Sequence, residues 1–282
     1  MLEEIAKRAR EAGRRSVLVT FEPHPLQIVN PQAAPQLLTV ADERREILAQ
    51  SELDAVVFLE FTRELSRYPP EEFVRLLVKR YNVKELVIGY DHGFGKGRSG
   101  DVDLLRVLGG QMGFDVDVVA EVDCDARPVS STRVRRSIAG GDLATASRLL
   151  GRHYSMTGPV VPGAGRGRHL GYRTINLRPS TPQKLLPPDG VYAVRVESAR
   201  GSSDGMMHQG PRPTFGEPER SLEVHLLDAA DDLYGTDVKV IWIERLRDVT
   251  AFTSPEALVE QLRADAVAAR RALTGRRGHG KH

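Results

Sequence analysis

The pattern of apolar and polar positions changes near residue 151. Before that point, continuous apolar runs of strand length alternate with segments of helical periodicity. The runs are residues 16–21, 55–59, 85–89 and 116–122, and the expected helices cover residues 2–13, 41–50, 69–80, 102–112 and 143–150. Continuous apolar runs are typical of strands buried on both faces, and their alternation with helices predicts a doubly wound, parallel α/β sheet.

After residue 151 the runs become short and alternate between apolar and polar positions, which is typical of antiparallel strands. The expected strands are residues 154–161, 191–196, 222–227 and 238–243. Their spacing predicts a small β-barrel or sandwich, and one amphipathic helix follows over residues 255–273. We therefore predict an α/β domain over residues 1–150, a β domain over residues 151–274 and a disordered basic tail over residues 275–282.

Composition narrows the class of protein. A length of 282 residues is about twice that of a typical domain, which agrees with two domains. Lys+Arg 40 and Asp+Glu 38 nearly cancel, so we expect no general affinity for nucleic acid. The single cysteine, Cys124, rules out an intramolecular disulfide and fits a reducing cytoplasm. Because no apolar run approaches the roughly 20 residues of a membrane span, we expect a cytoplasmic protein without a membrane partner.

Residues 163–176 hold four glycines and three arginines in fourteen residues. Glycine lets backbone N–H groups approach a ligand closely, and a series of such groups makes an anion site that arginine strengthens. The candidate phosphate-binding residues are Gly163, Gly165, Arg166, Gly167 and Arg168. Thr174 and Asn176 then lie on one side of an expected strand, and their oxygens suit Mg²⁺ beside a phosphate. From composition alone, a basic surface hairpin is an equally good interpretation.

The expected strand over residues 222–227 places Glu223 and His225 on the face opposite Leu222 and Val224. A solvated edge carboxylate is the default interpretation of Glu223. If this face lines a cleft, Glu223 is instead a candidate general base beside the phosphate site. The segment Pro211–Phe215 then forms the rim of that cleft, although a plain turn is as good an interpretation.

In the first half, polar segments follow two of the expected strands, at the carboxyl ends where doubly wound sheets bind ligands. Residues 22–25 contain two prolines that predict an extended turn, and His24 between them is either a ligand or a turn residue. Residues 95–100 match the G-x-G-x-x-G dinucleotide motif, but they follow the third strand rather than the first, which argues against a dehydrogenase. Further on, Ser130 or Ser131 is expected to cap a basic helix whose amino end favours an anion.

Taken in order, these segments resemble a known family. The motifs are Val19–Pro25, Gly89–Asp101, Ser130–Arg135, Gly163–Asn176, Pro188–Tyr192, Arg212–Phe215, Glu223–His225 and Asp232–Gly235. They are similar, from about residue 5 to residue 270, to the bifunctional prokaryotic riboflavin kinase/FMN adenylyltransferase family, also called FAD synthetases. The resemblance implies a nucleotidyltransferase-like α/β domain, with its first strand missing, followed by a small antiparallel β-barrel with a terminal helix.

The resemblance also implies roles for individual residues. In the barrel, Thr174 and Asn176 would hold Mg–ATP, Glu223 would be the catalytic glutamate, and the glycine segment would bind the nucleotide phosphates in a riboflavin kinase. In the α/β domain, the residues implied in flavin or nucleotide binding for FMN adenylylation are Phe21, Pro23, His24, Pro25, Asp91, Phe94, Gly95, Ser130, Ser131, Thr132 and Arg135. The implied substrates are riboflavin, FMN and ATP.

The sequence departs from the family pattern at several points. The family's first strand and its H-x-G-H loop have no counterpart, so we expect riboflavin kinase activity with doubtful adenylylation. A complete FAD synthetase with a start further upstream and a catalytically silent flavin- or nucleotide-binding module are the alternatives. Arg173 replaces a proline of the family, and His208-Gln209 replaces its usual Asn-Ile, which puts the flavin contacts of that segment in doubt.

Overall fold

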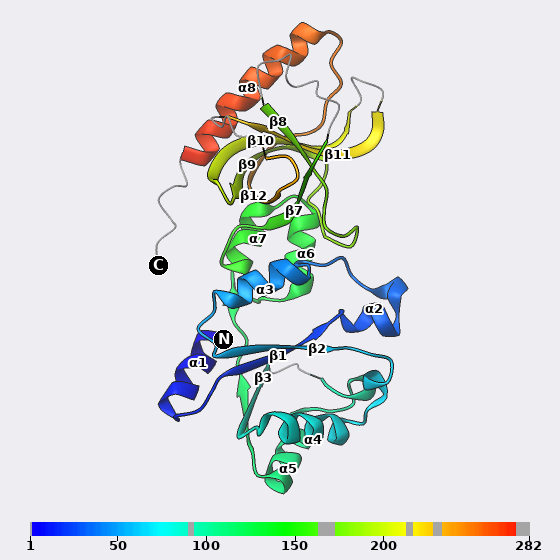
Figure 1. Cartoon of the computed structure of the whole chain (residues 1–282), viewed down its shortest axis with the longest axis vertical. Helices are drawn as coiled ribbons and strands as arrows, with labels where there is room; N and C mark the ends of the chain where they lie inside the picture. Colours follow the sequence, from blue (N-terminus) through cyan, green and yellow to red (C-terminus); the bar gives the residue numbers. More distant parts are fainter. Residues whose placement is uncertain (1, 90–92, 163–172, 213–216, 228–232, 275–282) are drawn as a thin grey trace. The chain divides into compact units, whose positions relative to one another are not determined.

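The computed structural model describes residues 2–89, 93–162, 173–212, 217–227 and 233–274 (Figure 1). The chain divides into two compact units. Residues 1–35 and 44–128 form the first, called the α/β unit, and residues 36–43 and 129–282 form the second, called the barrel unit. The barrel unit therefore includes a short segment from the first half of the sequence, here called the strap (residues 36–43).

The parallel strands of the α/β unit lie in two pairs. β1 (Val17–Glu22) pairs with β2 (Ala55–Glu60), and β3 (Glu85–Gly89) pairs with β4 (Asp115–Val119). The parallel α/β architecture expected from the sequence is confirmed. The expectation that these strands are buried on both faces is wrong, since most of their residues are only half-buried. The reason is that each described strand pairs along one side only, which leaves its other edge more open.

Helices connect and cover these strands. The helices of the first half are α1 (Leu2–Glu11), α2 (Pro25–Val29), α3 (Ala41–Ala49), α4 (Pro70–Tyr81) and α5 (Val102–Met112), with 3₁₀ turns η1 (Pro31–Ala33), η2 (Leu65–Arg67) and η3 (Lys96–Arg98). A hairpin of β5 (Asp123–Cys124) and β6 (Arg127–Pro128) follows β4. The core is formed by Val74, Ile88, Phe94, Leu105, Leu108 and Phe114. Residues 23 and 24 form the expected turn after β1, with His24 in an extended conformation, and Pro25 then begins α2, a short helix that the sequence did not predict.

Six antiparallel strands close into a barrel in the order β10-β11-β8-β7-β12-β9, so the expected barrel or sandwich is a barrel. The strands are β7 (Ser155–Val161), β8 (Arg173–Leu177), β9 (Gly190–Ser198), β10 (Gly201–Arg212), β11 (Glu217–Leu226) and β12 (Asp237–Arg247). Helices α6 (Ser131–Ala139) and α7 (Leu143–Leu150) precede it, and α8 (Pro255–Thr274) runs along its outside (Figure 1). No helix within the described ranges is both long and apolar enough to cross a membrane.

The strap is held against the barrel by a buried ion pair. The Nζ of Lys184 lies 2.6 Å from a carboxylate oxygen of Glu43, and the two side chains are 1% and 5% exposed. Lys184 Nζ also donates to the carbonyl oxygens of Ser155, at 2.7 Å, and Leu38, at 2.9 Å. Glu43 in turn accepts the backbone N–H of Thr157 at 2.9 Å. Burial lowers the pKa of Lys184 to about 8, and the neighbouring Glu43 charge opposes that shift.

This ion pair completes one edge of a barrel strand. Among the described residues, β7 and β8 pair at the last two residues of β7, Val160 and Val161. Earlier along the same edge, the carbonyl of Ser155 and the N–H of Thr157 are satisfied by Lys184 and Glu43 in place of a neighbouring strand. Buried backbone groups require such partners. The strap therefore substitutes for strand pairing where β8 no longer accompanies β7.

A second charged clamp ties α8 to the barrel. Arg247, at the end of β12, contacts both carboxylate oxygens of Asp265 on α8, with Nε 2.9 Å from Oδ1 and Nη2 2.7 Å from Oδ2. Asp265 is 4% exposed and also accepts from Gln261 at 2.8 Å. The apolar face of α8 packs on Ala193, Met206 and Ile243, on the outer surface of the barrel.

Candidate active site

The barrel places three polar residues in one row across three neighbouring strands. Two of them, Asn176 and Glu223, are predicted site residues, and the third is His208. In the strand register, Glu223 of β11 lies directly opposite Asn176 of β8 on one side and opposite His208 of β10 on the other. Directly opposed residues of antiparallel strands share a face of the sheet. The side chains of Asn176, Glu223 and His208 therefore lie on the same face, and we call them the base row.

A second row lies two residues further along the strands. His225 is opposite Thr174 on β8 and opposite Met206 on β10. Two residues correspond to about 7 Å along a strand. Thr174 thus lies one such step from Asn176, on the same face. In the sequence, the glycine-rich residues 163–172 directly precede β8, which begins at Arg173.

Burial shows that the rows lie on the outer face of the barrel. The intervening residues Ile175, Leu177 and Val224 are at most 6% exposed and point inward, whereas Thr174, Asn176 and Glu223 are half-buried. This is the face that the alternation of residues 222–227 predicts for Glu223. His225 is more buried, at 8% exposed, since its opposite residue Met206 lies beneath α8.

The donor set at this surface fits a hard divalent cation. Thr174 and Asn176 offer a hydroxyl and an amide oxygen, and the Glu223 carboxylate lies across from Asn176. Mg²⁺ prefers oxygen ligands, keeps several waters and is commonly shared with substrate phosphates. In the described part of the chain, no group of three or more His, Cys, Asp or Glu residues could hold a metal by itself. Thr174, Asn176 and Glu223 are the described residues at this surface whose oxygens could hold such a cation.

Several predicted residues lie outside the described ranges. These are Gly163, Gly165, Arg166, Gly167 and Arg168 of the glycine segment, and Asp91 of the first half. Their phosphate- or nucleotide-binding roles stay predictions. Arg173 is described as the first backbone position of β8.

At the carboxyl end of β1, the predicted residues have structural partners. Phe21 packs edge-to-face on Phe61, with ring centroids 5.0 Å apart. Pro23 follows a cis peptide bond from Glu22. His24 caps α2, because its Nδ1 accepts the N–H of Leu26 at 3.2 Å while Gln27 accepts the N–H of His24 at 3.0 Å. The turn interpretation of His24 is thus supported, and a ligand role stays a prediction.

Phe94 and Gly95 are also accounted for by packing. Phe94 is 7% exposed and belongs to the core of the α/β unit. Gly95 has φ +70°, and a Cβ at this position would lie 2.8 Å from Pro70. Glycine is therefore required here for both conformation and space. Nucleotide contacts of these two residues stay predictions.

The remaining predicted residues belong to the barrel unit. Ser130 caps α6 by accepting the N–H of Arg133 at 3.3 Å, and Ser131 and Thr132 form the first turn of that helix. Arg135 donates from Nε to the carbonyl oxygen of Gln36 in the strap, at 2.9 Å. Burial lowers the pKa of Arg135. The capping role expected for Ser130 is confirmed, and its anion-binding role stays a prediction.

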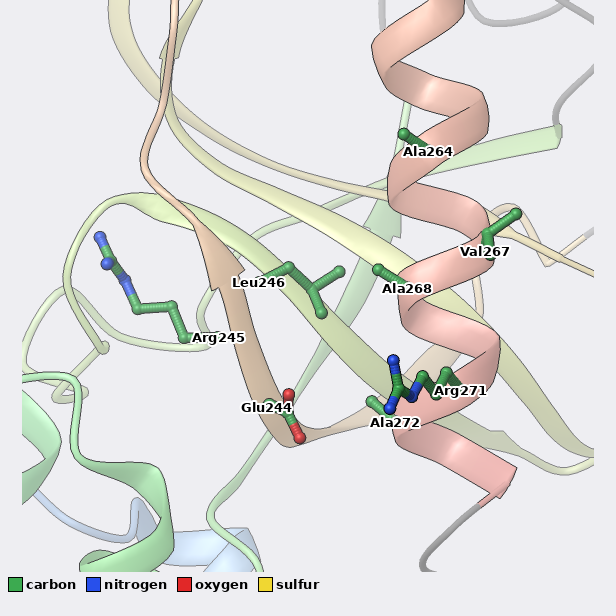
Figure 2. Close-up of a pocket in the computed structure, with 8 residues that line it drawn as sticks. All are labelled: Glu244, Arg245, Leu246, Ala264, Val267, Ala268, Arg271 and Ala272. Atoms are coloured by element: carbon green, nitrogen blue, oxygen red, sulfur yellow. The ribbon is translucent and has the colours of Figure 1, made fainter.

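A groove that the sequence did not reveal lies between the end of β12 and α8 (Figure 2). It has a volume of about 670 Å³ and is lined by Glu244, Arg245, Leu246, Ala264, Val267, Ala268, Arg271 and Ala272. Figure 2 shows Leu246 directed toward Ala268 of the helix, whereas Arg245 points away from it. Arg245 is engaged elsewhere, donating to the carbonyl oxygen of Asp189 at 2.7 Å. None of the residues that line the groove belongs to the two rows, which lie on β8, β10 and β11.

Comparison with known proteins identifies both halves of the chain. A family model described as FAD synthetase matches residues 1–133, and one described as riboflavin kinase matches residues 150–273. A bifunctional riboflavin kinase/FMN adenylyltransferase from Pseudomonas fluorescens is 39% identical over 282 residues, covering 99% of this chain and 89% of the relative. The chain belongs to this bifunctional family.

Other relatives of the riboflavin kinase/FMN adenylyltransferase family agree. The protein of that description from Escherichia coli K12 is 35% identical over 96% of this chain and 86% of its own. A crystal structure described as a macrolide-efflux protein from Streptococcus pneumoniae superimposes with a TM-score of 0.84 at 32% identity, covering 95% of this chain and 88% of that one. The resemblance carried by the motifs and the expected two-part fold are confirmed. The expectation that the amino-terminal activity is impaired is not confirmed, since the family model matches that half as well.

Proposed function

We propose that the barrel with its terminal helix is a riboflavin kinase that transfers the γ-phosphoryl group of MgATP to the 5′-hydroxyl of riboflavin, giving FMN and ADP. The observation that carries this proposal is the base row, in which Glu223 lies directly opposite Asn176. Membership of the bifunctional family supports the choice of substrates. The kinase region is proposed to be residues 151–274.

The order of the two rows suggests where ATP and riboflavin bind. The glycine segment 163–172 enters β8 next to Thr174, so the phosphates of ATP are proposed to lie at that end, held by Gly163, Gly165, Arg166, Gly167 and Arg168. Thr174 and Asn176 would hold the Mg²⁺ ion, which neutralises phosphate charge when bound. The acceptor hydroxyl then lies at the base row, about 7 Å further along the strands.

In this arrangement Glu223 acts as general base. Its carboxylate takes the proton of the riboflavin 5′-hydroxyl as that oxygen forms a bond to the γ-phosphorus. The bond from the γ-phosphorus to the β–γ bridging oxygen breaks, and ADP leaves. Phosphoryl transfer depends mainly on positioning and charge neutralisation, so a carboxylate beside two hard oxygen donors is a chemically sufficient set.

The amino-terminal region, residues 1–150, is proposed to catalyse the second step, in which FMN attacks the α-phosphorus of ATP and pyrophosphate leaves, giving FAD. The proposed contacts are those that the family resemblance implies. Formation of FAD from FMN and MgATP by the purified chain tests this step, and absence of FAD would refute it.

The kinase proposal is tested by incubating the purified chain with riboflavin and MgATP and separating flavins by chromatography. Wild type should form FMN. Glu223→Gln keeps the size of the side chain and removes the base, so kcat should fall by about 10²- to 10⁴-fold while the urea midpoint stays unchanged. Unchanged turnover in Glu223→Gln would refute the assigned base, and absence of FMN from wild type would favour a silent binding module.

A further inference from the structure

His208 is the third member of the base row. It lies opposite Glu223 on β11 and opposite Val191 on β9. Its side chain is half-buried. Its Nε2 lies 3.0 Å from the carbonyl oxygen of Pro211. A carbonyl oxygen only accepts, so this contact requires Nε2 to carry the proton.

The backbone that His208 contacts is irregular. The pairing of β10 with β11 shifts between Gly210 and Arg212, as in a β-bulge. Gly210 has φ +132°, and a Cβ there would lie 2.9 Å from the side chain of Asp189. β-Bulges occur next to active sites, where they redirect the chain and its side chains. The hydrogen bond from His208 to Pro211 thus joins residues on the two sides of the bulge, and it lies on the outer face of the barrel.

The same strand is anchored from the inner face by the next residue. Gln209 is fully buried, and its Nε2 donates to the carbonyl oxygen of Pro188 at 3.0 Å and to that of Pro187. Hydrogen bonds therefore hold the bulge on both faces of β10. On the outer face, the hydrogen bond comes from His208, which lies opposite the proposed base Glu223.

We propose that His208 is a positioning residue for the acceptor substrate. His208 fixes the Pro211 backbone relative to Glu223 and so sets the position of the polyhydroxyl chain of riboflavin. This role rests on the proposed kinase function. ATP is bound at the Thr174 end and does not depend on it. Loss of the hydrogen bond from His208 to Pro211 should therefore weaken riboflavin binding but not ATP binding.

The test compares His208→Phe, which keeps a ring without the donor, with His208→Gln, whose amide N–H reaches about the position of Nε2. In His208→Phe the KM for riboflavin should rise about tenfold, equal to about 1.4 kcal/mol, with the KM for ATP within about twofold of wild type. His208→Gln should restore the riboflavin KM to within about threefold of wild type. His153→Phe, at a half-buried histidine between α7 and β7, is the matched control and should change neither KM.

Equal changes of both KM values in His208→Phe, or no change in either, would overturn the inference. Failure of His208→Gln to restore the riboflavin KM would do so as well. Equilibrium titration of riboflavin fluorescence in the presence of MgADP separates this inference from the kinase proposal. If wild type forms no FMN, the kinase proposal fails, and unchanged riboflavin affinity in His208→Phe then refutes the positioning role independently.

Discussion

The most informative stability experiment removes one charge of the buried pair that holds the strap. Glu43→Gln preserves the shape of the side chain, but its amide offers only one acceptor oxygen. The carboxylate of Glu43 accepts from Lys184 at 2.6 Å, Thr157 at 2.9 Å and Val40 at 3.1 Å. The amide NH₂ group must face at least one of these donors, and Lys184 is left buried without a counter-charge.

The expected loss follows from that geometry. Breaking a buried ion pair by neutralising one partner costs about 3–5 kcal/mol, because the other charge stays desolvated. The assay is urea unfolding followed by tryptophan fluorescence. Trp242 is the only tryptophan of the sequence, is fully buried in the barrel and stacks on Tyr154 with ring centroids 5.7 Å apart. The signal therefore reports on the barrel unit alone.

The matched control is Glu197→Gln, the same chemical change in the same unit. Glu197 lies 3.8 Å from Lys239, and its side chain is 47% exposed. Pairs of this kind contribute about 0–1 kcal/mol. If Glu43→Gln lowered the free energy of unfolding by no more than Glu197→Gln does, the argument that the strap completes the β7 edge would be refuted.

Two further predictions use the same fluorescence assay. Because burial lowers the pKa of Lys184 to about 8 from its usual 10.5, the unfolded chain binds more protons than the folded one between these values. The stability of wild type relative to Lys184→Met should therefore rise by up to about 3 kcal/mol across that pH range, and a fall would contradict the burial argument. Asp265→Ala, which leaves Arg247 without its carboxylate, should lower the free energy of unfolding by about 2–3 kcal/mol, whereas Asp237→Ala at an exposed position should change it by less than about 0.5 kcal/mol.

The sequence predicted the elements whose residues alternate or repeat regularly. Residues 222–227 alternate clearly, so the face occupied by Glu223 followed from the pattern. β10 was missed, because its inward positions include Ser203 and Gly205 and its first half shows no apolar alternation. The structure explains the glycine, since a Cβ on Gly205 would lie 2.7 Å from Val224. A small residue is required there by a neighbour that the local sequence does not reveal.

The sequence predicted which residues form the candidate site but not how they are arranged across the strands. Thr174, Asn176 and Glu223 were expected near one another, yet only the strand register shows that Glu223 faces Asn176 and His208 directly. The cap formed by His24 could have been found from the sequence, since a glutamine three residues later is the usual partner in a capping box. The strap carries no such local signal, because its partners are far away in the sequence.

That distance has a consequence for how the chain folds during synthesis. Glu43 and Lys184 are separated by 141 positions, so the strap leaves the ribosome long before its partner exists. At about 5–20 residues per second, roughly 7–28 s pass before Lys184 is made. During this interval Glu43 has no buried lysine to meet, and the edge of β7 cannot be completed when Ser155 and Thr157 first emerge. We expect the barrel to close late, in a step whose rate depends on this non-local contact.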